Sequence, residues 1–344
     1  MRLTGVSRSL SRVAGVLILS AAGWAQRVEL RSASAVYMHA PVDSNSPAFW
    51  RDGQFFLINS ANLPLITNAG SQFLMEETGE MDVNGLFHLP AWVESAWLDE
   101  DGTLLMWYHH EPTPVCPGSS LTVPVIGAAV SYDGGSSIYD LGIVLESGDA
   151  SDCASKNGFF AGGHGDFTVI PDRDQGYFYF LFTNYSGDAS GQGVAIARMA
   201  FADRYNPAGA VWKYFAGAWN EPGLGGRVTA VFPAARTWQR EDTDSFWGPS
   251  VHWNWYLGSY VVLLNHACCK PRWPQEGIYI SFNPELSDPA GWSLPERLLQ
   301  NIGFSPGYYA QILGTGPEET DTLAGPAARL YVQGISKWEL YFRP

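Results

Sequence analysis

The sequence predicts an all-β fold, a five-bladed β-propeller whose four-stranded antiparallel blades surround a central axis. Two observations lead to this prediction. A pair of apolar and aromatic segments around a tight polar turn recurs five times along the chain, and no stretch shows sustained helical periodicity. Four short strands in a unit that repeats about five times are typical of propeller blades.

The elements of the repeat can be recognised in order. Its first half is a hairpin, and in the first two copies an Asp-Gly pair supplies the positive φ angles that tight turns need. The hairpin occurs at residues 46–58, 94–108, 166–182 and 250–264, with a weaker fifth copy that pairs 309–313 with 328–332. A further strand, a turn and a short outer strand follow, most clearly at residues 277–292.

The last unit is short of its outermost strand. Residues 28–37 have a composition that could supply this strand, which would close the ring between the two chain ends and leave no open edge. A β-sandwich with long loops is the alternative, because a succession of strands and turns does not by itself determine the number of blades. A sandwich would not explain why the first strand of each unit opens with polar residues, which in a propeller converge on one mouth of the central channel.

Composition limits the partners. The chain has 344 residues, with 20 Lys and Arg against 34 Asp and Glu. The resulting net charge of −14 offers no positive field for nucleic acid or anionic lipid. The 14 Trp and 16 Tyr provide flat rings that can stack on sugars. We therefore expect a carbohydrate partner, no nucleic acid and no membrane. No oligomer interface is recognisable, so a monomer is expected.

Residues 1–25 have the features of an export signal, with three arginines, an apolar run at 13–22 and small residues before the expected cleavage after Ala25. A secreted protein with a single propeller domain at residues 26–344 is therefore expected. In an oxidising compartment Cys116 and Cys153 are the preferred disulfide pair. For the adjacent Cys268 and Cys269, a vicinal disulfide and two reduced thiols both remain open.

Three acids from successive units are predicted to meet at the mouth of the channel: Asp43, Glu94 and Asp166. Glycoside hydrolysis needs one carboxylic acid to protonate the leaving oxygen and one carboxylate to activate water or attack the sugar. These three residues are therefore the candidate catalytic groups. Asp43 could instead cap its own turn. Glu111 is a reserve candidate for the proton donor.

Other residues at strand ends are candidates for binding the substrate through hydrogen bonds or ring stacking. They are Asn45, His109, His110, His164, Trp247, His252 and Tyr309. An alternative for the histidines is to hold a metal ion on the axis, such as calcium. The hydrolysis itself requires no cofactor, and the sequence contains no zinc-finger spacing.

The run Gly277-Ile-Tyr-Ile-Ser-Phe282, followed by Leu286-Ser-Asp288 and Trp292, resembles the blades of the five-bladed propeller glycosidases, the superfamily of glycoside hydrolase families 43, 32, 62, 68, 117 and 130. The likeness extends over nearly all of residues 28–344. It implies an inverting mechanism in which Asp43 is the base, Glu94 the second-blade acid and Asp166 the third-blade proton donor. The chain departs from the family pattern by exchanging Glu and Asp in the second and third blades, which indicates a divergent member.

The sequence thus favours a secreted glycoside hydrolase that cleaves a poly- or oligosaccharide with carboxylates on the axis. The alternative is a propeller that binds carbohydrate without catalysis. A phosphorylase is disfavoured, because the segments expected at the mouth carry almost no Arg or Lys to bind phosphate.

Overall fold

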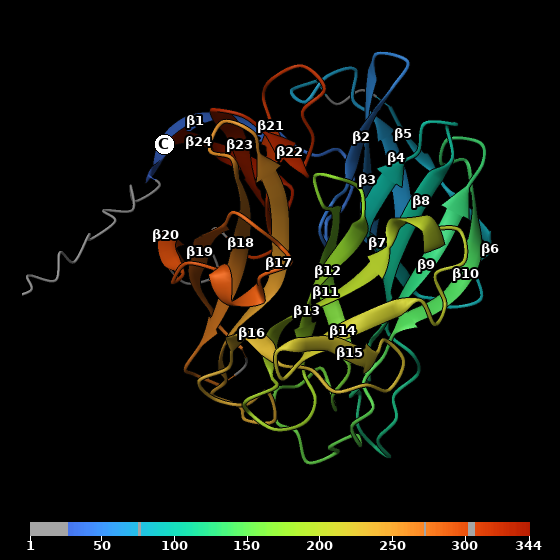
Figure 1. The fold of residues 1–344 in the computed structure, drawn as a ribbon, viewed down its shortest axis with the longest axis vertical. Coiled ribbons are helices and arrows are strands. Elements are labelled where there is room, and N and C mark those ends of the chain that lie inside the picture. Colours follow the sequence, from blue (N-terminus) through green and yellow to red (C-terminus); the bar gives the residue numbers. More distant parts are fainter. Residues whose placement is uncertain (1–26, 75–76, 272, 302–306) are drawn as a thin grey trace, which may run out of the picture.

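The computed structural model describes residues 27–344 except 75–76, 272 and 302–306, and the proposed export signal at 1–25 lies outside this part of the chain. The strands form five sheets that follow one another around a ring, one for each predicted unit (Figure 1). The described residues contain no α-helix, only the 3₁₀ turns η1 (Phe201–Asp203) and η2 (Pro289–Gly291). The prediction of a five-bladed propeller is confirmed.

Each blade begins with an inner strand and continues outward through antiparallel neighbours. Blade 1 contains β2 (Ala48–Arg51), β3 (Gln54–Ala61), β4 (Leu63–Asn68) and β5 (Glu77–Glu80). Blade 2 contains β7 (Ala91–Leu98), β8 (Leu104–His110), β9 (Val125–Ser131) and β10 (Ser137–Leu145), with β6 (Asp82–Gly85) parallel to β10. Blade 3 contains β11 (His164–Pro171), β12 (Tyr177–Asn184), β13 (Gly193–Ala200), β14 (Val211–Phe215) and β15 (Ala218–Pro222), and β16 (Ala230–Pro233) pairs with β13.

Blade 4 contains β17 (Asp244–Asn254), β18 (Ser259–Cys268), β19 (Gln275–Asn283) and β20 (Glu296–Gln300), with β22 (Leu323–Ala324) parallel to β17. Blade 5 contains β21 (Ala310–Gly314), β23 (Ala327–Val332), β24 (Ile335–Arg343) and, as its outermost strand, β1 (Arg27–Tyr37). Strand β1 pairs antiparallel with β24 from Arg27 opposite Arg343 to Tyr37 opposite Ile335. The predicted closure of the ring by the N-terminal segment is therefore confirmed.

The hydrophobic core is divided among the five contacts between neighbouring blades, with one buried cluster at each. Between blades 2 and 3, for example, Trp107 packs with Phe178 and Phe180, all at most 2% exposed. Alternation along each strand explains this arrangement, because successive side chains point to opposite faces and both faces of a blade are covered. Each fully buried side chain of this size contributes about 1.5–3 kcal/mol to the free energy of unfolding.

Polar side chains join each blade to the next near the axis, because the inner strands would otherwise leave backbone N–H groups unpaired. Ser60 Oγ accepts from the N–H of Val93, and Ser95 Oγ accepts from that of Val169. In the following blades the acceptors are Thr183 for Gly248, Asn265 for Ala310, and Gln311 for Ser46. These bonds complete a circuit around the ring.

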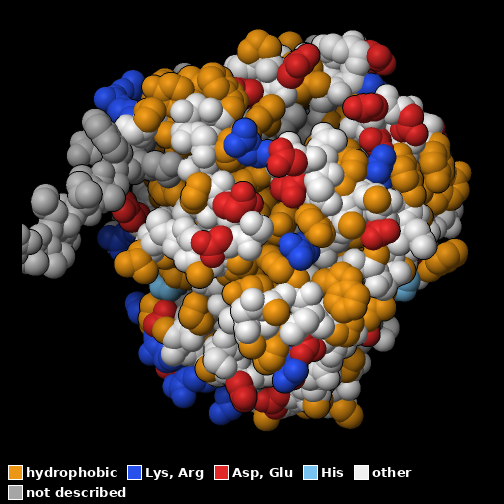
Figure 2. All heavy atoms as spheres, viewed as in Figure 1, with side chains coloured by type: hydrophobic (Ala, Val, Ile, Leu, Met, Phe, Trp, Pro, Cys, Tyr) orange, Lys and Arg blue, Asp and Glu red, His pale blue; other side chains and the backbone are white. Residues whose placement is uncertain are grey.

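Figure 2 shows the surface in the same view as Figure 1, with hydrophobic side chains exposed across the middle of this face and acidic and basic groups between them. Within the described part of the chain, no helix is long and apolar enough to cross a bilayer. The predicted disulfide between Cys116 and Cys153 is present and joins the β8–β9 connection to the β10–β11 connection.

Candidate active site

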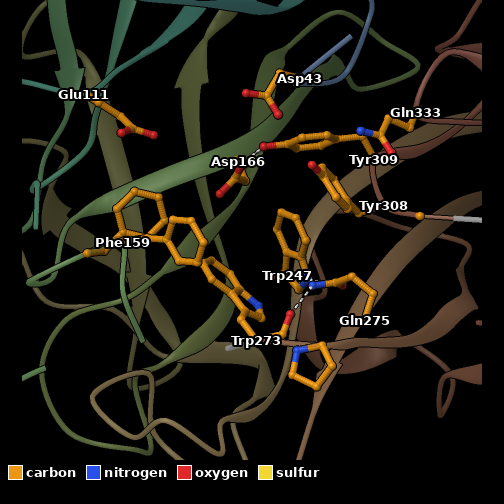
Figure 3. Close-up of a pocket in the computed structure, with 13 residues that line it drawn as sticks. Asp43, Glu111, Phe159, Asp166, Trp247, Trp273, Gln275, Tyr308, Tyr309 and Gln333 are labelled. Atoms are coloured by element: carbon orange, nitrogen blue, oxygen red, sulfur yellow. Dashed lines mark hydrogen bonds between the residues drawn. The ribbon is translucent and has the colours of Figure 1, made fainter. Parts of the chain in front are cut away.

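A cavity of about 520 Å³ lies where segments of all five blades and several connecting loops meet (Figure 3). Its lining combines three acids, a set of aromatic rings and two amides. The residues are Asp43, Glu111, Phe159, Phe160, Asp166, Trp247, Trp273, Pro274, Gln275, Gly307, Tyr308, Tyr309 and Gln333.

The three acids of the cavity come from three successive blades. Asp43 precedes β2, Glu111 directly follows β8, and Asp166 is the third residue of β11. Their carboxyl groups face the same part of the cavity in Figure 3. Asp43 is the most accessible of the three, Glu111 is partly buried, and Asp166 is only 2% exposed. Two of the three predicted catalytic residues, Asp43 and Asp166, and the reserve candidate Glu111 therefore share one cavity.

The inner strands of blades 2, 3 and 4 share an irregularity that directs side chains toward the axis. The register between strands shifts at Glu94, at Asp166 and at Gly248–Pro249. Asp166 has a positive φ of 43°, and so has Gly248 at 51°. A bulge places two residues opposite one and re-aims a side chain, and such bulges are frequent beside active sites. A Cβ on Gly248 would lie 2.7 Å from Asn265 Nδ2, so this position favours glycine.

Two phenols hold the carboxylate of Asp166. Tyr309 donates to Oδ1 at 2.7 Å, and Tyr185 donates to Oδ2 in a short hydrogen bond. Burial and the negative charge of Asp166 raise the pKa of both tyrosines well above its ordinary value, so both hydroxyls keep their protons. Each oxygen of Asp166 is therefore an acceptor with a defined partner.

Glu94 and His109 form a buried pair beneath the cavity. Glu94 is 2% exposed, Oε2 accepts from the N–H of Phe167 at 2.7 Å, and Oε1 lies 3.3 Å from His109 Nδ1. Burial raises the pKa of Glu94. Burial alone would lower the pKa of His109, but the bond with Glu94 and the charges of the surrounding acids raise it. The pair therefore holds at least one proton at neutral pH, and His109 Nε2 lies 3.6 Å from Glu111 Oε1.

Two acids of the cavity, Asp43 and Glu111, have raised pKa values. The pKa of Asp43 rises to about 6, because of partial burial first and the charges of Asp166 and Glu111 second. Burial also raises the pKa of Glu111, and the charge of Asp166 adds to this effect. Such shifts bring carboxyl groups into the range in which they exchange protons near neutral pH.

Aromatic side chains form the other wall of the cavity. Figure 3 shows the rings of Phe159, Trp273 and Trp247 lying together, with Tyr308 beside Tyr309. The indole nitrogen of Trp247 donates to Gln275 Oε1 at 2.8 Å, which fixes the orientation of the ring. The centroids of the Trp247 and Trp273 rings are 5.2 Å apart. This wall offers ring faces for stacking, and two of the predicted binding residues, Trp247 and Tyr309, belong to the cavity.

The other predicted binding residues do not line the cavity. Asn45 bridges blades by donating to the carbonyls of Phe167 and Pro249, and His109 supports Glu94 as described. His110 lies outside, where Nδ1–H donates to the carbonyl of Pro90 at 2.9 Å.

His164 and His252 are both buried between strands. His164 Nε2 accepts from Lys213 Nζ at 2.9 Å, and burial followed by the charge of that lysine lowers its pKa far below the ordinary value. Burial also lowers the pKa of His252 to about 3, and its ring packs against Phe342. Both imidazoles are therefore neutral and belong to the blade interior.

The loops supply lining residues that sequence analysis did not identify. Phe159 and Phe160 lie in the β10–β11 connection, Trp273 and Pro274 precede β19, and Gln333 follows β23. No repeat marks these positions, although the adjacent aromatic residues at 159–160 were visible in the sequence.

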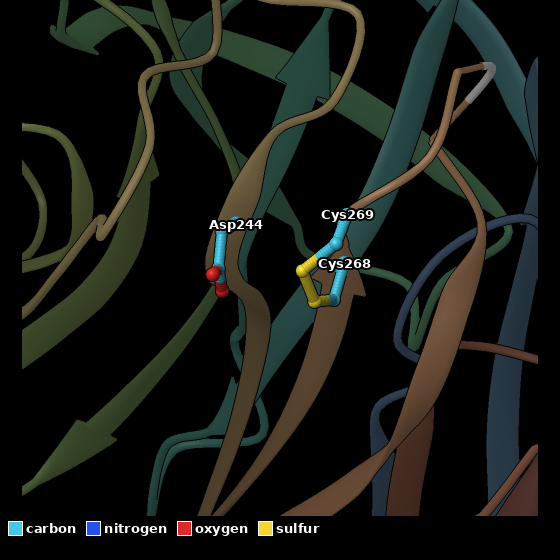
Figure 4. A group of neighbouring side chains, drawn as sticks. All are labelled: Asp244, Cys268 and Cys269. Carbon is cyan, nitrogen blue, oxygen red and sulfur yellow. A yellow bond between two sulfur atoms is a disulfide. The ribbon is translucent and has the colours of Figure 1, made fainter.

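A second disulfide lies just before the segment that carries Trp273 and Gln275. Cys268 and Cys269 are bonded to each other at the end of β18, which decides between the two alternatives left open by the sequence, and Asp244 lies across from them (Figure 4). Because both sulfurs are engaged, this group offers no thiolate to a metal ion.

One buried group could in principle ligate an axial metal. Ligand atoms of Glu94, His109 and Asp166 lie within 4.8 Å of one another. Calcium requires six to eight oxygen ligands, whereas this group has one nitrogen and two carboxylates. Both oxygens of Asp166 and one of Glu94 already accept from O–H or N–H donors that point at them. The donor set therefore does not fit calcium.

No protein-family model matches the sequence, and no curated protein matches it. Solved structures do match. An endo-arabinase from Bacteroides thetaiotaomicron shares 10% identity at a TM-score of 0.52, over 90% of this chain and 96% of that one. An α-L-arabinanase from Cellvibrio cellulosa shares 10% identity at a TM-score of 0.51, over 87% of this chain and 91% of that one.

An exo-β-1,3-galactanase from Phanerochaete chrysosporium shares 12% identity at a TM-score of 0.50, over 93% of this chain but only 64% of its own. The chain therefore spans about two thirds of that galactanase. At these identities the likeness shows the fold, which is the one expected from the resemblance to five-bladed propeller glycosidases.

Proposed function

We propose that the chain is a glycoside hydrolase that cleaves a poly- or oligosaccharide in the axial cavity. The observation that supports this is the meeting of Asp43, Glu111 and Asp166 beside an aromatic wall in one cavity of about 520 Å³. Carboxyl groups with raised pKa values supply acid and base, and ring faces bind sugars. The similarity in fold to two arabinanases and a galactanase adds to this support.

In the proposed mechanism Glu111 is the proton donor. A donor needs a carboxyl with a raised pKa that reaches the substrate, and Glu111 lines the cavity and has this shift. The resemblance to the family implies Asp166 in this role, but both of its oxygens accept phenol protons. Asp166 is better suited to act as a fixed negative charge that raises the pKa of its neighbours. Glu94 lies below the cavity and is assigned a supporting role through His109.

Asp43 is proposed as the general base, as the family resemblance implies. Glu111 protonates the glycosidic oxygen while the bond to the anomeric carbon breaks. Asp43 takes a proton from a water molecule whose oxygen attacks the opposite face of that carbon, so the configuration inverts. Proton NMR of the first product formed would distinguish inversion from retention.

We also propose that the protein is exported, on the basis of the sequence of residues 1–25. N-terminal sequencing of the mature protein from the culture medium or periplasm would locate the cleavage, which is expected after Ala25. A mature protein that retains this segment would contradict the proposal.

The test of function is a reducing-sugar screen of the purified protein on arabinan, xylan, fructan, galactan and mannan. On the substrate that is cleaved, Glu111→Gln is expected to reduce kcat by about 10²- to 10⁴-fold. Glu77→Gln changes an exposed glutamate of β5 and serves as the matched control. Both variants should unfold at the same temperature as the unmodified protein.

Two outcomes would contradict the proposal. Equal kcat for Glu111→Gln and the unmodified protein would remove this residue from the mechanism. Binding of a polysaccharide without any product after prolonged incubation would favour the alternative, a propeller that binds carbohydrate without cleaving it.

A further inference from the structure

A second concave site lies on the outer part of blade 3, separate from the axial cavity. It encloses about 310 Å³ and is lined by aromatic, charged and small residues. They are Tyr177, Arg198, Ala200, Asp203, Ala210, Trp212 and Trp219. Its volume is at the lower end of the range of about 300–1,000 Å³ for small-molecule sites.

The register of the sheet places the key side chains on one face of the blade. Arg198 lies opposite Trp212 on β14, and Ala200, two residues along β13, lies opposite Tyr177 on β12. Nearer the axis this face packs against blade 4, through Leu181 among others. Blades diverge with distance from the axis, so the outer strands on this face are not covered by the next blade.

Trp212 is 47% exposed although it is the largest kind of apolar side chain. Beside it the guanidinium of Arg198 lies 4.3 Å from the ring centre of Tyr177 and 4.7 Å from that of Trp219. These two contacts hold the guanidinium between the rings. Among the described residues, Arg198 forms no ion pair with a carboxylate, and Asp203 forms none with a basic side chain. The guanidinium interacts with the Tyr179 hydroxyl but has five N–H donors, so Arg198 keeps donors and Asp203 keeps acceptors for a ligand.

The exposed indole of Trp212, the guanidinium of Arg198 and the carboxylate of Asp203 together indicate the chemistry of the ligand. An exposed indole face binds the apolar face of a sugar ring, while a guanidinium donates to its hydroxyls and a carboxylate accepts from them. One positive and one negative group in the same site give no net preference for an anion such as phosphate. We infer that this site, named here the blade 3 site, binds a neutral saccharide unit.

The blade 3 site and the axial cavity lie toward opposite ends of the blade. Asp166 is next to Phe167, which pairs with Phe182 near the end of β12, whereas Tyr177 is the first residue of β12 and pairs with Ala200 at the end of β13. The blade 3 site is therefore a separate place of attachment for a polysaccharide. This inference concerns binding and does not depend on whether the axial cavity is catalytic.

The inference can be tested by native electrophoresis in gels that contain soluble arabinan, arabinoxylan or galactan. Trp212→Ala and, independently, Asp203→Ala are expected to weaken the retardation of the protein at least tenfold in dissociation constant. Tyr132→Ala removes an aromatic side chain that is 67% exposed on blade 2 and should leave retardation unchanged. Trp247→Ala, which alters the axial cavity, should leave a substantial part of the retardation.

The results separate this inference from the proposed hydrolysis. It would be overturned if Trp212→Ala were retarded as strongly as the unmodified protein, if none of the three polysaccharides retarded the unmodified protein, or if Trp247→Ala alone abolished retardation. Product formation from short oligosaccharides is measured separately and should be the same for Trp212→Ala and the unmodified protein. Failure of hydrolysis with intact retardation would refute only the proposed function.

Discussion

The charge of Asp166 should contribute to the raised pKa of Asp43 across the axial cavity. The pKa of Asp43 is about 6, against 3.8 for an ordinary aspartate, because of burial first and the charges of Asp166 and Glu111 next. Asp166→Asn nearly preserves the shape of the side chain and removes its charge. Because burial contributes more than Asp166, the substitution should lower the pKa of Asp43 by about one pH unit or less.

Carbon-13 NMR titration of protein labelled at the aspartate carboxyl carbons measures this directly, with the Asp43 resonance assigned from Asp43→Asn. Asp203→Asn removes an exposed carboxylate of the blade 3 site and is the matched control, for which no change at Asp43 is expected. In a pH profile of kcat/KM the acidic limb should move to lower pH, because the base then stays ionised in more acidic solution. An unchanged pKa of Asp43 in Asp166→Asn would contradict the electrostatic coupling between the two carboxyl groups.

Three further predictions concern stability. Lys213→Met should lower the free energy of unfolding by about 3 kcal/mol, because two carbonyls and the His164 imidazole lose a buried donor. Urea unfolding measures this change, and an unchanged midpoint would contradict the prediction. Burial lowers the pKa of Lys213 to about 7. The unfolded chain keeps this proton up to about pH 10.4, so the stability of the unmodified protein should rise between about pH 7 and 10, a rise that Lys213→Met should reduce. Replacing both Cys116 and Cys153 with Ser should cost about 4 kcal/mol, since the bond spans 37 residues, and equal thermal unfolding midpoints would refute this.

The fold could be predicted because its signals are local and repeated. Hairpins such as residues 94–108 combine alternating apolar residues with a turn that requires glycine, and five copies identify the architecture. The closure by β1 could also be predicted, because the last unit lacked a strand and the N-terminal segment had the composition of one. The pairing of Cys116 with Cys153 was expected for an exported chain and is present.

The candidate site could be predicted only in part, because a polar residue at the start of an inner strand can either face the cavity or bond to groups of the neighbouring blades. Asp43 and Asp166 reach the cavity, whereas Asn45 bonds to the backbone of other blades and Glu94 lies below the cavity. The difference depends on bulges and on pairing between blades, neither of which leaves a periodic signal. The loop residues were missed for a related reason, since Trp273 reaches the cavity through a connection whose path is set by tertiary contacts.

The pairing of β1 with β24 also affects the order in which the molecule can form. Blade 5 contains both the first and the last strand of the described chain, so the contacts that complete it join residues separated by more than 300 positions, as Arg27 and Arg343 are. During synthesis this blade cannot assemble until its final strand has left the ribosome. Contacts of such long range slow folding. Until β24 has formed, the face of blade 4 that contacts blade 5 lacks the packing of Leu340 and Phe342, so closure of the ring depends on this strand.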